Sequence, residues 1–476
     1  MLFNSTAFLF AFLPLVLIVY YLLPHRRQNA FLVIASLFFY ASWDWRFLFP
    51  LLFTTLVDYW VARQLEVEHA AASPSKRKLK QYVLISIVSN LTLLAFFKYF
   101  NFFTQSAVTL AHAVGVNIQL TVFEIVLPLA ISFYTFQALS YTIDVYRGQL
   151  HATKSFGDFF LAVLYFPHLI AGPIQRAATL LPQVVNPRRI TRLQINDGLH
   201  LILWGLFKKV YIADNLAPIA NAVFADPSPT GAMTLIGIYA FTFQIYCDFS
   251  GYTDIARGIA KIMGFEFNLN FNLPYFATNP SDFWRRWHIS LSQWLQDYLY
   301  KPLGGNRGGG VLTYRNLLIT MVLGGLWHGA AWNFIVWGLY HGCLLIGHRL
   351  LTPMLQQLDK LISSPRVWLA IRIVSMFLLT CYGWLLFRAT SIHQIIAMTG
   401  ALQTPFAGMD MHLLARISGF VLPLAIVQAI QLKTGELQFM GLPWISSPVK
   451  VVIYSVLVYL MVFSGGQPQA FVYFQF

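Results

Sequence analysis

Long apolar stretches recur along almost the whole chain, and they constrain its fold more than any other feature. A helix needs about 20 mainly apolar residues to cross the hydrocarbon core of a bilayer. Only 11% of the residues are charged, which is too few to cover the surface of a soluble protein of this size. We therefore predict an all-α, polytopic integral membrane protein with about 11 to 13 membrane helices, re-entrant segments included. The clearest stretches are 5–23, 29–43, 46–62, 82–102, 122–145, 197–221, 232–247, 313–327, 331–350, 367–387, 411–430 and 448–464.

The connectors between these stretches are short, which predicts a single membrane-embedded domain over residues 1–476. Basic residues gather in three connectors, at 25–27, 76–80 and 188–192. The positive-inside rule assigns such loops to the cytoplasm, and the number of preceding spans then puts the N-terminus on the periplasmic side. The net charge of +14 is thus explained by membrane topology, and we expect no nucleic-acid partner.

The region 265–312 does not read as an ordinary span. Asn279 is suited to cap a helix whose first residue is Pro280. The spacing predicts one continuous amphipathic helix from there, lying in or under the membrane interface, with Trp284, His288, Leu291 and Leu295 on one face. The glycine-rich segment 304–310 that follows lacks the Lys-Ser/Thr ending of a phosphate-binding loop, so we predict a turn.

The region 156–195 is the second exception. It is apolar up to Ile170 and continues as 171–176 (Ala-Gly-Pro-Ile-Gln-Arg). Its two ends are expected on the same side of the membrane, so we predict a re-entrant hairpin that is buried in protein.

Two histidines are the strongest candidates for chemistry. His328 lies in the apolar, glycine-rich segment 324–333, and His288 lies on the apolar face predicted above. Imidazole exchanges protons near neutral pH, and ionisable groups inside apolar segments are costly enough to mark function. Glycines beside His328 would let a substrate approach closely. From spacing alone, each ring is also compatible with a packing role that satisfies one hydrogen bond.

The segment 247–257 places two acidic residues in a long apolar run. Asp254 and Arg257 are three positions apart and can pair on one helix face. Asp248 has no local partner, so we expect it to bond to a histidine or to a backbone group. Structural support is the favoured role for both acids. The three cysteines show no metal-site or disulfide spacing, and no metal is expected.

Several motifs together resemble the membrane-bound O-acyltransferase superfamily, in particular the bacterial branch that contains the membrane subunit of alginate O-acetylation. The most specific are 283–290 (Phe-Trp-Arg-Arg-Trp-His-Ile-Ser), 297–306 and Trp327-His328-Gly329. The opening 1–5, the segment 171–176 and the run 248–252 match as well. The resemblance implies helices around a central passage open to both faces.

The resemblance also implies roles and partners. His328 is then the catalytic histidine and His288 the second functional residue. Trp327, Asp248, Arg285 and Asn333 are predicted to support them. Acetyl-CoA is the expected donor substrate, with no permanently bound cofactor. We further expect a bacterial inner-membrane location, a polysaccharide acceptor and a periplasmic partner similar to acetyltransferases or esterases. Arg176, Arg188 and Arg189 are candidates to attract the donor phosphates, without any one being assigned.

Alternatives remain open at this point. Related systems O-acylate peptidoglycan or add D-alanine to teichoic acid. A polysaccharide exporter without acyl chemistry is a different class, and the lack of an internal repeat disfavours it. For His328 itself, a general base and an acetylated relay are both compatible with the sequence.

Overall fold

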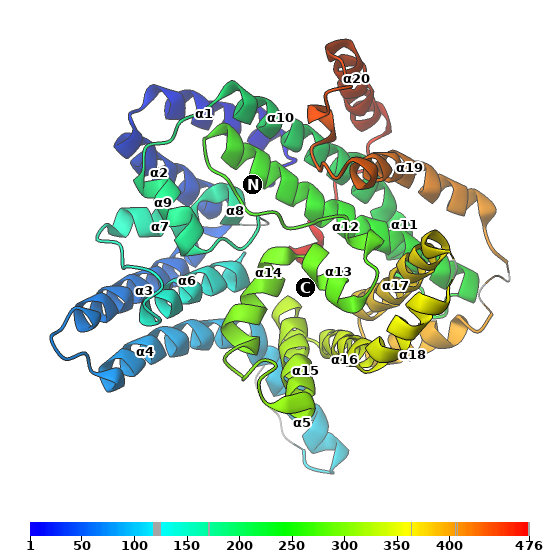
Figure 1. Cartoon of the computed structure of the whole chain (residues 1–476), viewed down its shortest axis with the longest axis horizontal. Coiled ribbons are helices and arrows are strands. Elements are labelled where there is room, and N and C mark those ends of the chain that lie inside the picture. The colour runs from blue at the N-terminus through cyan, green and yellow to red at the C-terminus, as the bar shows by residue number, and fades with distance from the viewer. Residues whose placement is uncertain (118–124, 170–171, 363, 405, 407, 475–476) are drawn as a thin grey trace. The chain divides into compact units, whose positions relative to one another are not determined.

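The computed structural model describes all residues except 118–124, 170–171, 363, 405, 407 and 475–476 (Figure 1). The described residues form helices and connecting segments, with no β-strand among them. The predicted all-α class is therefore confirmed. The chain divides into two compact units, unit 1 comprising Met1–Gly198 with Ala256–Asn268 and unit 2 comprising Leu199–Ile255 with Leu269–Phe476. The single domain over residues 1–476 stays a prediction.

Seven helical runs in the described part of the chain are long and apolar enough to cross a membrane. The predicted multi-pass membrane protein is thereby supported. The shorter apolar helix 7–22 and a division of one long run account for part of the higher count expected from sequence. The run His25–His69 has 45 residues, which at about 1.5 Å per residue is twice the thickness of a bilayer core. Its backbone becomes extended at Asp44, so the run is two helices rather than one. The seven runs are His25–His69, Lys76–Ala113, Gly231–Ile262, Trp332–Leu361, Pro365–Arg388, Met411–Thr434 and Ser447–Ser464.

Unit 1 is built around helices α3, α4 and α6, which contact one another pairwise. A buried carboxylate, Asp58 of α3, accepts hydrogen bonds from Ser86 Oγ at 2.5 Å and from Asn90 Nδ2 at 2.9 Å, both on α4. Ser86 in turn bonds to Thr142 of α6 at 2.8 Å. Buried polar groups in an apolar environment need such partners, and here they join three helices. The helices of unit 1 are α1 (Leu13–Leu22), α2 (His25–Asp44), α3 (Leu48–His69), α4 (Lys76–Leu94), α5 (Phe100–Ala113), α6 (Ile131–Tyr146), α7 (Phe156–Leu164), α8 (Phe166–Leu169) and α9 (Ala177–Val185).

The region predicted as a re-entrant hairpin consists of the short helices α7, α8 and α9, separated by non-helical backbone. Of the matching segment 171–176, Ala171 lies outside the described residues. The remainder is non-helical from Gly172 to Arg176. Broken backbone over an apolar stretch agrees with the prediction, and the membrane depth of the segment stays a prediction.

Unit 2 contains the other long helices and the motif segments that carry both histidines. Helices α10 and α12 contribute residues to both units. The π-helical segment Phe207–Ala213 connects α10 to α11. The helices are α10 (Arg192–Leu206), α11 (Asp214–Ala225), α12 (Gly231–Ile262), α13 (Pro280–Arg286), α14 (Ile289–Leu295), α15 (Gly309–His328), α16 (Trp332–Leu361), α17 (Pro365–Arg388), α18 (Ile392–Ala401), α19 (Met411–Thr434) and α20 (Ser447–Ser464).

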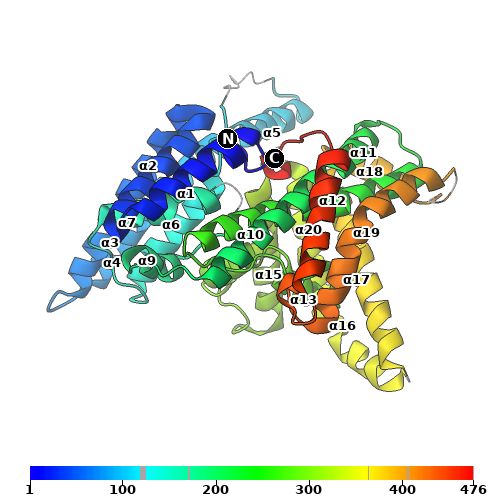
Figure 2. The ribbon, with the colours of Figure 1, turned by 90° about the horizontal axis from the view of Figure 1, so that it is seen from above.

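Helix α15 packs against α16, and α17 packs on α16, beside which it lies in Figure 2. Glycines allow this approach. A Cβ atom added at Gly325 would overlap the carbonyl oxygen of Phe334, and one added at Gly338 would overlap that of Met321. Small residues at such crossings let helix backbones come together in membranes. This contact fixes the C-terminal end of α15, where His328 is the last helical residue.

Candidate active site

The predicted continuous helix beyond Pro280 is wrong, because the chain breaks between α13 and α14. The start was predicted correctly: the Asn279 side chain accepts the N–H of Asp282 at 2.8 Å, and Pro280 is the first helical residue. Trp287 then adopts an extended conformation and His288 a left-handed one, with φ of 42°. That conformation costs a non-glycine residue about 1–3 kcal/mol and is found preferentially at functional sites.

Asn270 holds the break in place. Its side-chain Oδ1 accepts hydrogen bonds from Ser290 Oγ at 2.9 Å and from the Ser290 N–H at 3.2 Å, while its backbone oxygen accepts the N–H of Ile289 at 3.0 Å. The same Oδ1 lies 3.3 Å from Nδ1 of His288. Asn270 and His288 are both fully buried. A single buried amide therefore satisfies the first turn of α14 and orients the imidazole.

His288 lies outside the seven candidate spans, and burial lowers the pKa of its ring because the charged form would lose its hydration. The neutral ring carries one proton. An amide oxygen can only accept, so the Nδ1 atom facing Asn270 is the protonated one. The Nε2 atom of His288 then carries the lone pair and can receive a proton.

His328 is positioned differently, by aromatic packing. Only 5% of its surface is exposed. Its ring centroid lies 5.0 Å from that of Trp337, 5.1 Å from that of Trp327 and 5.4 Å from that of Phe387. These rings come from α15, α16 and α17, so three helices confine one imidazole.

The structure brings the two predicted histidines together. Their ring centroids are 6.3 Å apart, and the Trp327 ring lies 5.8 Å from that of His288. Phe249 of α12 packs on His288 at 4.8 Å. His288 and His328, which are 40 positions apart in the sequence, thus lie close together in unit 2.

Sequence reasoning missed Tyr473, which lies in the same place. Its ring centroid is 5.6 Å from that of His328 and 6.5 Å from that of His288. The Tyr473 hydroxyl is buried and has no hydrogen-bond partner among the described residues, so it is available to a substrate oxygen. The available signal was the aromatic-rich segment 471–474 (Phe-Val-Tyr-Phe), which follows the last apolar stretch after a glycine pair.

The predicted supporting residues fall into three kinds of environment. Asn333 is buried and donates to the carbonyl oxygen of Phe387 at 3.0 Å, which supports a ring that packs on His328. Asp248 accepts the N–H of Val472 at 2.7 Å, one of the backbone partners expected for it. Arg285 has 69% of its side chain exposed and lies 3.8 Å from Asp282. The structure therefore groups Trp327 and Asn333 with His328, and their catalytic roles stay predictions.

Among the arginines considered for donor binding, Arg188 has extensive bonds within unit 1. It donates to Tyr20 at 2.9 Å, to Asn29 at 2.8 Å and to Gln28 at 3.1 Å. Its guanidinium also lies over the ring of Phe265, at 4.5 Å from the centroid. These bonds give Arg188 a structural task, while a role in donor binding stays a prediction.

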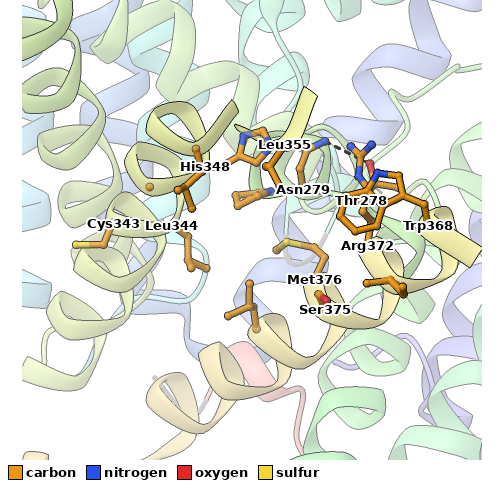
Figure 3. A pocket seen from close by; sticks show the side chains of 15 residues that line it. Thr278, Asn279, Cys343, Leu344, His348, Leu355, Trp368, Arg372, Ser375 and Met376 are labelled. Atoms are coloured by element: carbon orange, nitrogen blue, oxygen red, sulfur yellow. Dashed lines mark hydrogen bonds between the residues drawn. The ribbon is translucent and has the colours of Figure 1, made fainter. Parts of the chain in front are cut away.

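A separate pocket of about 320 Å³ lies between α16, α17 and the residues 278–280 (Figure 3). Its walls are mainly apolar, with Leu344 and Leu355 from α16 and Met376 from α17. His348 and Arg372 add polar groups to the lining. Neither His288 nor His328 lines this pocket, so we do not place the reaction there.

Comparison with known proteins shows the family of the chain. A model of the membrane-bound O-acyltransferase family matches residues 80–392. The chain belongs to the membrane-bound O-acyltransferase family. That match includes His288, His328, Asp248 and Asn333, and ends before the C-terminal segment that carries Tyr473.

Three relatives with different names illustrate the kinds of protein to which this O-acyltransferase is similar. The chain is 44% identical over 392 residues to a protein of Azotobacter vinelandii named probable alginate O-acetylase AlgI, covering 82% of this chain and 76% of the relative. It is 36% identical to a peptidoglycan O-acetyltransferase of Helicobacter pylori, covering 83% and 78%. It is 29% identical to a teichoic acid D-alanyltransferase of Bacillus subtilis, covering 56% and 69%. The chain is therefore a multi-pass membrane enzyme that transfers acyl groups to oxygen.

Proposed function

We propose that this O-acyltransferase takes acetyl groups from cytoplasmic acetyl-CoA and moves them across the bacterial inner membrane for O-acetylation of an extracytoplasmic polysaccharide. A periplasmic partner protein, similar to acetyltransferases or esterases, completes delivery, and the N-terminus of the membrane enzyme is periplasmic. The observation that carries the proposal is the pairing of His288 and His328, 6.3 Å apart within the part of the chain that the family model matches. The relatives named alginate O-acetylase support acetyl as the group and polysaccharide as the acceptor.

In the proposed reaction, His328 acts as a general base. It takes the proton of an attacking hydroxyl as the oxygen forms its bond to the thioester carbonyl carbon. The carbon–sulfur bond then breaks, the CoA thiolate receives the proton and the acetyl ester is released. General base catalysis of this type contributes about 10²–10⁴-fold. The acetylated-imidazole route remains the alternative for the same ring.

The Asn270 contact restricts what His288 does in this scheme. With Nδ1–H donated to Asn270, the lone pair of the neutral ring lies on Nε2, the atom that would accept a hydrogen bond from a hydroxyl. To polarise the donor carbonyl, the ring would first have to gain a proton at Nε2. We therefore propose that His288 orients the attacking hydroxyl through its Nε2 atom, while His328 takes the proton.

Two other acceptors remain candidates because relatives use them. The peptidoglycan O-acetyltransferase covers as much of this chain as the alginate relatives but is less similar, at 36% against 44%. The D-alanyltransferase is less similar again and covers 56% of the chain. Acetylation of an alginate-like or cellulose-like polysaccharide is therefore the first choice.

The proposal is tested with inverted membrane vesicles, whose cytoplasmic face is outward. Labelled acetyl-CoA is added outside, and alginate, acetyl-accepting cellulose or peptidoglycan fragments are enclosed together with the periplasmic partner. We expect ester-linked label inside vesicles with the wild-type enzyme and none with His328→Ala. Label that never reaches any enclosed polymer would contradict the proposal, and polymer movement independent of acetyl-CoA would indicate an exporter.

A further inference from the structure

A buried ion cluster bonds to the C-terminal segment just before Tyr473. Lys209, in the π-helical segment Phe207–Ala213, has its Nζ atom 2.8 Å from Asp214 Oδ1 and 2.8 Å from Asp248 Oδ1. The three side chains are at most 2% exposed. The same Nζ atom donates to the backbone oxygen of Gln469 at 3.0 Å. Asp248 Oδ2 accepts the N–H of Val472 at 2.7 Å.

We propose that Lys209, Asp214 and Asp248 form a clamp that holds the C-terminal segment 465–473 and thereby positions Tyr473 beside the two histidines. These three are positioning residues, because they act through the segment rather than on the substrate. The proposal rests on the proposed function in one respect: the histidine pair is taken as the reaction site. The proposal adds to the reaction site a part of the chain that lies beyond the region matched by the family model.

The clamp uses backbone groups that a merely stabilising ion pair would not need. Exchanging a buried ion pair for apolar side chains of similar size often leaves a protein equally stable, so ion pairing alone explains little. Here, two of the cluster's bonds go to the main chain of the segment, at Gln469 and Val472. An anchor on backbone groups fixes the position of a chain whatever its side chains are. The last anchored residue, Val472, directly precedes Tyr473.

The beginning of the segment is fixed by close backbone contact. The N–H of Gly466 donates to the oxygen of Val210 at 3.0 Å, and Asn215 Nδ2 donates to the oxygen of Ser464 at 2.8 Å. A Cβ atom added at Gly466 would overlap the backbone of Asp214. The segment therefore rests directly on the chain that supplies Lys209 and Asp214.

The end of the segment reaches the site through aromatic contacts. Phe471 packs on Tyr252 of α12 at 4.6 Å, and Tyr473 packs on Phe249 at 4.5 Å. Phe249 also contacts His288 at 4.8 Å. Since Asp248 and Phe249 are neighbours on α12, one turn of that helix contributes both the anchor and the contact with the reaction site.

The chain offers a matched control in the neighbouring residue. Lys208 is buried as well, with 4% of its side chain exposed, but it pairs with Asp254 at 2.7 Å and Ser250 at 2.9 Å. No hydrogen bond of Lys208 to the C-terminal segment is found among the described residues. Loss of either lysine removes the cation beside a buried or partly buried carboxylate, which is costly in both cases. Only loss of Lys209 also removes an anchor of the segment.

The test compares Lys209→Met with Lys208→Met in the full chain, purified in lipid nanodiscs. A carboxypeptidase is added, and the intact mass of the protein is followed over time. Removal of Tyr473 and of the residues before it then reports that the segment has been released. We expect trimming at least about tenfold faster in Lys209→Met than in Lys208→Met, because an anchored backbone resists opening. Lys209→Arg keeps the charge and should restore most of the resistance. Equal trimming rates in the two methionine variants would overturn the clamp.

A second variant keeps the test decisive if Lys209→Met does not fold. Gly466→Ala leaves the ion cluster chemically intact but prevents the close approach to Asp214, and Gly419→Ala, where no atom lies within 4 Å of the added Cβ, is its control. We expect faster trimming only in Gly466→Ala. In the acetylation assay, the same variant should lower kcat at least about fivefold with the KM for acetyl-CoA within about twofold, because the donor site is not altered.

Failure of the clamp and failure of the proposed function give different results. Trimming rates measure the segment without reference to acetyl transfer. If the wild-type enzyme shows no acetyl-CoA turnover while the trimming contrast holds, the proposed function is wrong and the clamp stands. If turnover is normal but Gly466→Ala and Lys209→Met keep wild-type kcat despite fast trimming, the segment is not part of the reaction site.

Discussion

The two histidines of the site are held by different means. His328 ends a regular helix, and its ring is confined by the rings of Trp327, Trp337 and Phe387. His288 interrupts a helix, and its backbone is held in a left-handed conformation by the side chain and backbone of Asn270. The first ring is fixed by side-chain packing, and the second by hydrogen bonds of its ring and of the residues that follow it to Asn270.

This difference predicts how each position responds to mutation. Replacing the His328 ring leaves the end of α15 defined by the glycine contacts with α16, so chemistry is lost and the fold is kept. Replacing His288 removes the ring, while Asn270 still caps α14 through Ser290 and Ile289. Replacing Asn270 should disturb both the ring and the helix. Activity and local structure therefore become separable at these positions.

The largest effect is expected for His328→Ala. If this ring is the general base, polymer acetylation should fall by at least about 10²–10⁴-fold, because no other group takes the hydroxyl proton. The acetyl groups carried by the isolated polymer are measured. Size-exclusion profiles in detergent check that the variant inserts and folds. A variant with normal polymer acetylation would remove His328 from the mechanism and leave its aromatic surround as packing alone.

His288→Ala should cause a large loss with residual activity, about tenfold to a hundredfold, since it removes an orienting group while His328 remains. The measurement is the initial rate of acetyl-CoA turnover in nanodiscs. His288→Asn is the matched variant, because it keeps a polar group of smaller size at the left-handed position, which asparagine tolerates well. An unchanged rate in both variants would make His288 a structural residue.

Asn270→Leu separates the two tasks of that amide. It keeps the volume but removes the Oδ1 acceptor, so the Nδ1 proton of His288 is no longer held and the Ser290 groups lose their partner. We expect about a tenfold fall in kcat with a lowered unfolding temperature, because a buried hydrogen-bond network loses its centre. Asn270→Asp retains an acceptor and serves as the control. If Asn270→Leu matched the wild type in both measurements, the tautomer assignment for His288 would fail.

The contrast also shows what the sequence could reveal. The apolar stretches, the Asn279 cap and the setting of His328 follow from local patterns, namely length, capping chemistry and residues in one helix. The break at His288 depends on Asn270, which is 18 positions upstream and reaches His288 only in the folded chain. No helical periodicity contains that information, so the continuous helix was the natural but wrong prediction.

The same reasoning applies to the C-terminal segment. Lys208 and Lys209 lie inside the apolar stretch 197–221, and a charge in such a place requires a partner. The sequence therefore contained a sign of a buried ion cluster. It did not reveal that the partners of Lys209 are Asp248, 39 positions away, and the backbone of Gln469. Long-range pairing of this kind is fixed by tertiary structure alone.

The smallest effects are expected at the two arginines that end α13. Comparing them tests whether contacts away from the rings help to hold His288. Arg286 has 28% of its side chain exposed, bonds to Asp282 at 2.9 Å and also reaches the oxygen of Asn272 at 3.4 Å. Arg285 is largely exposed and lies 3.8 Å from the same carboxylate. Exposed ion pairs contribute little, whereas the partly buried Arg286 ties α13 to the backbone of Asn272, two residues after Asn270, and so helps to fix the break. We therefore expect Arg286→Ala to reduce acetyl-CoA turnover about threefold to tenfold and Arg285→Ala to change it less than about twofold. Both variants are compared in the same nanodisc preparation. If Arg285→Ala were the more damaging of the two, the result would indicate that the Arg285 guanidinium contacts a substrate and that the break at His288 does not depend on Arg286.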